Sequence, residues 1–122
     1  VLYIEKFIPD GAQQTMSSKI GLRSPMYCTA VGKAILSTYS DEAIHKVWDA
    51  TQIKAHTENT ITNVEDLMSE IKMIRQQGYA EDKEENETGI FCIGTYFVNF
   101  RNEVQGAISL SFPTAQIFLY HN

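Results

Sequence analysis

The chain has 122 residues, 43% of them hydrophobic, and a net charge of −5, which fits one domain with a core of its own. No run approaches the roughly 18 apolar residues that a membrane-spanning helix needs, and nothing at the start resembles a secretory signal. The basic residues are scattered, and residues 81–87 carry five acids against one lysine. We therefore expect no membrane association and no direct contact with nucleic acid.

Two cysteines, Cys28 and Cys92, make no disulfide framework, so a reducing cytoplasm is the expected location. No paired Cys/His spacing indicates a metal site, and we expect neither a metal nor a cofactor. Both ends of the chain fall inside apolar periodic segments. We therefore expect residues 1–122 to be one domain of a longer polypeptide.

Taken in chain order, the sequence predicts strands over residues 1–8 and 13–19, then a helix capped by Thr29 and running to about residue 38. A short helix begins at residues 40–42. Residues 62–65 read as a capping box that opens a longer helix ending before Gly78. Strands follow over residues 79–82, 90–98 and 104–112, the last two joined as a hairpin. This order predicts an α+β fold, an antiparallel sheet with helices packed against it.

The start of the first predicted helix is a candidate anion site. Free N–H groups there favour anions, and small residues let a carboxylate come close, so the amides of Ala30 and Val31 are the candidates. Alternatively, Ala30 and Gly32 only allow close packing of helix on sheet. Lys33 either reaches the anion or, as is more common for a helix lysine, lies in solvent.

The last strand offers two hydroxyls. Because side chains alternate along a strand, Ser109 and Ser111 share a face with Ala107, and residues 104, 106, 108, 110 and 112 share the other. A buried hydroxyl needs a partner, which a ligand would supply if the serine face lines a cavity. If that face meets solvent, the serines carry no function.

Cys92 lies on the neighbouring strand, on one face with Ile90. A free cysteine is usually a small buried hydrophobe, and a nucleophile would need a lowered pKa and a nearby base. Asp82 ends a short strand before the acidic loop, where its carboxylate could accept hydrogen bonds from a ligand. Glu85 could instead hold that loop.

Several segments in this order resemble the C-terminal effector-binding domain of IclR-type bacterial transcription regulators. They are residues 26–34 (MYCTAVGKA), 78–82 (GYAED), 84–85 (EE), 89–93 (GIFCI) and 109–113 (SLSFP). The resemblance spans nearly the whole chain. It implies a GAF-like, profilin-like α/β fold, here a single effector-binding domain over residues 1–122. It also implies a winged helix-turn-helix DNA-binding domain elsewhere in the full-length regulator.

The resemblance further implies a pocket for a small carboxylate. Backbone amides at Ala30 and Val31 would hold the carboxylate, and apolar neighbours would correspond to Met16 and Ile90. The polar wall would be made by Asp82, Cys92, Ser109 and Ser111. Two departures, the bulk of Ala30-Val31 and a serine at position 24, favour a hydroxylated sugar acid over pyruvate or glyoxylate.

The leading interpretation is a ligand-sensing regulatory domain, not an enzyme, that forms a dimer or tetramer and controls DNA binding as a repressor or activator. DNA would be bound only through the other domain. Two alternatives stay open: a GAF-like thiol enzyme using Cys92 with Cys28, and a purely structural dimerisation module.

Overall fold

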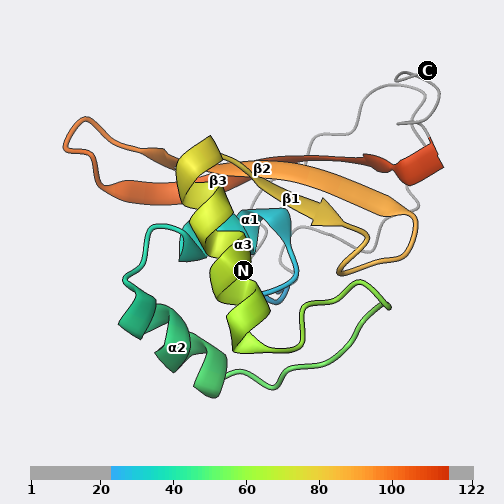
Figure 1. Cartoon of the computed structure of the whole chain (residues 1–122). Helices are drawn as coiled ribbons and strands as arrows, with labels where there is room; N and C mark the ends of the chain where they lie inside the picture. Colours follow the sequence, from blue (N-terminus) through green and yellow to red (C-terminus); the bar gives the residue numbers. More distant parts are fainter. Residues whose placement is uncertain (1–22, 116–122) are drawn as a thin grey trace.

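The structure, a computed structural model, describes residues 23–115. Three helices, α1 (Ala30–Leu36), α2 (Asp41–Asp49) and α3 (Val64–Gln77), precede three strands, β1 (Ala80–Lys83), β2 (Ile90–Val98) and β3 (Val104–Pro113) (Figure 1). The α+β fold class is confirmed, and the strands predicted over residues 1–8 and 13–19 lie outside the described residues. Within residues 23–115, no helix combines the length and apolar character needed to cross a bilayer.

Each helix begins at a polar cap. The Thr29 side chain accepts the Gly32 N–H at 3.1 Å and caps α1, as predicted. The Ser40 side chain accepts the Ala43 N–H and caps α2. The cap of α3 is Asn63 rather than Thr62, because the Asn63 side chain accepts the Asp66 N–H at 2.9 Å and donates back to Asp66 Oδ2 at 2.8 Å. The capping box predicted from Thr62 is therefore wrong by one residue; asparagine serves as well as threonine at this position.

The sheet is antiparallel in the order β1-β2-β3, and the predicted hairpin is confirmed. The register shifts near the hairpin, where Phe97 lies opposite Gly106 but Val98 lies opposite Val104. Gln105 is the extra residue of this β-bulge. A bulge moves the residues beyond it to the other face, so the prediction that Val104 shares a face with Gly106 is wrong.

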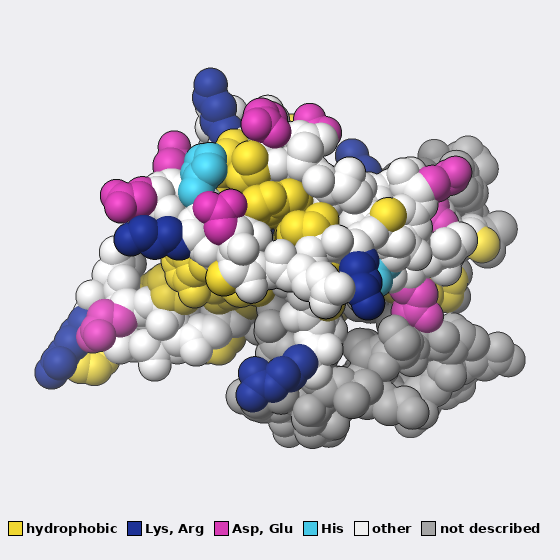
Figure 2. Space-filling view, turned by 90° about the horizontal axis from the view of Figure 1, so that it is seen from below, with side chains coloured by type: hydrophobic (Ala, Val, Ile, Leu, Met, Phe, Trp, Pro, Cys, Tyr) yellow, Lys and Arg dark blue, Asp and Glu magenta, His cyan; other side chains and the backbone are white. Residues whose placement is uncertain are grey.

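Helix α1 contacts all three strands, α3 contacts α1, and α2 contacts α3. The core between these elements is a cluster of buried residues: Tyr27, Cys28, Ala34, Leu36, Ile44, Leu67, Ile71, Ile74 and Ala80. The opposite face of the sheet carries exposed apolar side chains, with Ile108 63% and Leu110 71% exposed. Figure 2 shows the molecule from below relative to the view of Figure 1. On this face, lysine and arginine side chains lie apart from one another.

Candidate functional site

Three polar side chains form a row across the sheet. Asp82 on β1 lies opposite Cys92 on β2, which lies opposite Ser111 on β3. Directly opposite residues of antiparallel strands share a face, and the Cys92 Sγ and Ser111 Oγ atoms are 3.1 Å apart. The predicted carboxyl, thiol and hydroxyl groups are thus brought together.

The next row along the same face lies beneath α1. It consists of Ala80, Gly94 and Ser109, about 6.7 Å from the first row because a strand rises about 3.3–3.4 Å per residue. A Cβ added at Gly94 would lie 3.2 Å from the backbone carbon and from the Cβ of Ala30. The first residue of α1 therefore sits directly on the strand that carries Cys92.

Backbone N–H groups at the start of α1 differ in whether they have an acceptor within the helix. The Gly32 N–H is satisfied by Thr29, and the Lys33 N–H bonds the Thr29 carbonyl at 2.9 Å. Helix geometry gives the Ala30 and Val31 amides no acceptor within α1. Both residues are buried, so close packing of helix on sheet, the alternative left open above, is also present.

Exposure differs among the predicted site residues. Asp82 is buried, Cys92, Ser109 and Ile90 are half-buried, and Ser111 is exposed. Ile90 shares the face of Cys92, at the far end of β2 from the hairpin. Met16 lies outside the described residues.

Burial raises the pKa of the Asp82 carboxyl to about 6. The Glu85 N–H, which donates to Asp82 Oδ1 at 2.8 Å, opposes this rise, whereas the nearby Glu85 carboxylate adds to it. With that pKa, about a tenth of the molecules carry a protonated Asp82 at pH 7. This carboxyl can therefore either accept or donate a hydrogen bond close to neutral pH.

Burial also raises the pKa of the Cys92 thiol to about 11; the hydrogen bond with Ser111 lowers it, and the charges of Asp82 and Glu87 raise it further. The pKa of Cys28 rises to about 12, chiefly through burial. Because the thiolate is the nucleophile, neither cysteine is poised for attack at neutral pH. Among residues 23–115, no three His, Cys, Asp or Glu side chains gather closely enough to hold a metal ion.

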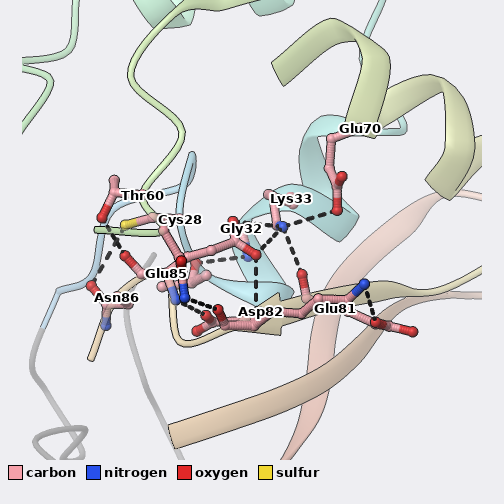
Figure 3. Close-up of polar contacts among 12 residues, drawn as sticks. Cys28, Gly32, Lys33, Thr60, Glu70, Glu81, Asp82, Glu85 and Asn86 are labelled. Carbon is pink, nitrogen blue, oxygen red and sulfur yellow. Dashed lines mark hydrogen bonds and ion pairs between the residues drawn. The ribbon is translucent and has the colours of Figure 1, made fainter. Parts of the chain in front are cut away.

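The sequence did not identify Lys33 and Glu85 as a pair. Lys33 is fully buried rather than solvated, and its Nζ lies 2.9 Å from both carboxylate oxygens of Glu85 (Figure 3). The Lys33 Nζ atom points toward β1 and toward the acidic loop that follows it. No signal in the local sequence distinguishes Lys33 from an ordinary solvated helix lysine.

Known proteins match this chain over most of its length. A family model described as bacterial transcriptional regulator IclR C-terminal matches residues 1–119. The HTH-type transcriptional regulator KdgR of Escherichia coli (strain K12) is 37% identical over 114 residues, 93% of this chain and 43% of that protein. The transcriptional repressor IclR of the same organism is 32% identical over 117 residues, again 93% and 43%.

Solved structures of transcriptional regulators have the same fold as this chain. The C-terminal domain of E. coli KdgR has a TM-score of 0.74 at 35% identity, over 84% of this chain and 64% of that chain. The transcriptional regulator YaiJ has a TM-score of 0.89 at 31% identity, over 97% and 66%. The chain spans less than half the length of the curated relatives named above, which are regulators rather than enzymes. This chain therefore belongs to the IclR C-terminal family, the effector-binding domains of bacterial transcriptional regulators.

Proposed function

We propose that this domain senses a small carboxylate metabolite, a sugar acid or a 2-keto acid, and thereby controls the DNA binding of its regulator. The observation that carries the proposal is the row of Asp82, Cys92 and Ser111, which lies beside α1 on the same sheet face and runs from a buried carboxyl through a half-buried thiol to an exposed hydroxyl. A carboxyl, a thiol and a hydroxyl side by side offer both donors and acceptors to a hydroxylated ligand.

The ligand carboxylate would lie at the start of α1, on the amides of Ala30 and Val31. These amides carry the partial positive charge of a helix start, which favours an anion. Ser109, one row from Ser111 and opposite Gly94, would complete the polar wall, and Ile90 would contribute apolar contact. Met16 is kept in the proposed apolar set on the family resemblance alone.

Asp82 supports the choice of an anion in spite of its own charge. Its raised pKa means that an arriving carboxylate can be met by the protonated acid, which donates a hydrogen bond instead of repelling the ligand. A solved structure described as a double mutant of the inducer-binding domain of the PobR transcription factor from Acinetobacter, in complex with 3-hydroxybenzoic acid, has the same fold. Its 24% identity shows the fold alone, so the ligand class rests on the site residues here.

Binding would change regulation only if the ligand prefers one quaternary arrangement over another. We propose a dimer or tetramer whose subunit arrangement sets the spacing of the DNA-binding domains. Sedimentation of the domain with and without ligand would measure this, and an unchanged oligomer distribution would contradict this part of the proposal.

The central test is a ligand panel followed by calorimetric melting of the domain. Gluconate, galacturonate, pyruvate and glyoxylate are the carboxylates, and glucose is the neutral control. We expect at least one carboxylate to raise the Tm at saturating concentration and glucose to leave it unchanged.

Site variants then locate the effect. Asp82→Ala and Ser111→Ala should remove the Tm shift, whereas Ser69→Ala, the same serine change at an exposed position of α3, should keep it. A folded domain that responds to none of the carboxylates refutes the proposal. A response that survives both site variants places the ligand elsewhere.

A further inference from the structure

The ammonium group of Lys33 is fully buried in the middle of α1. Besides the two Glu85 oxygens, its Nζ contacts the Glu81 carbonyl at 2.6 Å and Glu70 Oε1 at 3.3 Å. Taking such a charge out of water costs several kcal/mol per ion, which only partners with good geometry offset. Lys33 therefore joins α1 to β1, to α3 and to the acidic loop after β1 (Figure 3).

Glu85 passes this connection on to Asp82. Its carboxylate holds Lys33 and also accepts the Lys83 N–H at 3.1 Å. Its backbone N–H donates to Asp82 Oδ1 at 2.8 Å, and its carbonyl accepts from Thr60 Oγ1 at 2.6 Å. The same residue that neutralises Lys33 thus orients the Asp82 carboxyl, together with the backbone N–H of Asn86.

The loop backbone around Glu85 needs such support. Glu84 has a φ of 57°, in the left-handed region that non-glycine residues seldom adopt. Its Oε1 accepts the Gly89 N–H at 2.7 Å, which ties the start of the loop to its end. A backbone of this kind persists only where the surrounding contacts hold it in place.

We propose that the Lys33–Glu85 ion pair is the positioning device of the ligand site, holding the acidic loop and aiming the Asp82 carboxyl at the ligand. This inference rests on the function proposed above. Lys33 and Glu85 are positioning residues that act through Asp82. Stability alone is a weak explanation for the pair, because well-packed apolar replacements of buried ion pairs are often neutral or stabilising.

Stability and positioning should therefore respond differently when the ion pair is replaced by apolar residues, which allows a test. Lys33→Met leaves a buried carboxylate unpaired and should lower the unfolding free energy strongly, while the double variant K33M/E85M should regain most of the loss. The double variant should not regain the position of the acidic loop and of the Asp82 carboxyl. In the double variant, without any ligand, the amide hydrogen of residue 85 should exchange at least tenfold faster relative to that of Ile71, a buried α3 residue that reports global opening.

The matched control is E42M/K46M, which removes an exposed ion pair of α2 whose Lys46 Nζ and Glu42 Oε1 atoms are 3.6 Å apart. It should leave exchange at residue 85 unchanged. If K33M/E85M does not fold, Glu85→Gln keeps the side-chain shape and should still speed this exchange several-fold. Wild-type exchange at residue 85 in whichever of these two variants is measured overturns the inference.

Affinity provides the second readout. The Kd for the carboxylate with the largest Tm shift should rise at least tenfold in K33M/E85M and stay unchanged in E42M/K46M. A wild-type Kd in the double variant would also overturn the inference. If no carboxylate binds the wild-type domain, the proposed function fails, and hydrogen exchange still decides whether the ion pair orders the loop.

Discussion

Replacing Gly32 by alanine should destabilise the domain, although alanine is the better helix former. A Cβ at position 32 would lie 2.4 Å from Met26 Cα, 2.6 Å from the Met26 carbonyl oxygen and 2.6 Å from Thr29 Oγ1. Carbon atoms in contact prefer about 3.5–4.0 Å, so the shortfall exceeds about 1 Å. Two of the three obstacles are backbone atoms, which no side-chain rotation can move.

The magnitude follows from two opposing effects. Overpacking of a tight site costs about 1–3 kcal/mol, and backbone obstacles favour the upper end of that range. Alanine regains about 1 kcal/mol of helix propensity over glycine. The net loss should be about 2 kcal/mol, or roughly 8 °C in Tm for a domain of this size.

Urea unfolding followed by Trp48 fluorescence measures the loss. The matched control is Gly106→Ala, where the nearest obstacle is the tip of the Phe97 ring at 3.0 Å, a side chain that can turn away. We expect Gly106→Ala to change the unfolding free energy by less than about 1 kcal/mol. A Gly32→Ala variant as stable as the wild type would refute the claim that the backbone of Met26 leaves no room for a Cβ at position 32.

Three further predictions concern single groups. The pKa of Asp82 is raised from 3.8 to about 6 on folding, so its contribution to stability is present below pH 4 and is lost as the pH rises through about 6. Over that window, the unfolding free energy of the wild type should fall relative to that of Asp82→Asn. If urea titrations show that the difference between the two free energies does not change with pH, the raised pKa is contradicted. With its pKa raised from 9.0 to about 11, Cys92 should react with a thiol reagent at pH 7.5 about 100-fold more slowly than a free cysteine, while rapid labelling would revive the thiol-enzyme alternative. Asn63→Ala should cost about 1 kcal/mol of unfolding free energy and Thr62→Ala almost nothing, and the reverse order in thermal melts would restore Thr62 as the cap of α3.

Local patterns predicted most of the described elements. The 3.6-residue period of α3 and the glycine at position 78, which has a φ of 88°, mark a helix and its end without reference to the rest of the fold. The alternation along residues 107–111 placed both serines on one face, and the register places that face with Cys92. The candidate site could be assembled this far because strand pairing follows from a hairpin.

The remaining features depend on tertiary contacts. The bulge at Gln105 arises from how two strands meet, so a strict alternation misplaced Val104. The environment of Lys33 depends on three partners from residues 70, 81 and 85, which nothing in the local sequence brings together. A lysine in a helix is normally solvated, and only the fold shows that this one is enclosed.

The apolar side chains that are exposed on the sheet face away from α1 affect how the domain can be studied. Because side chains such as Ile108 and Leu110 are exposed, we expect hydrophobic dyes to bind the domain even while it is native. A melting curve read from such a dye would begin with a high signal and understate any ligand effect. Calorimetry, or the emission of Trp48, which lies edge-on to the Tyr27 ring at a centroid distance of 5.8 Å, avoids this background.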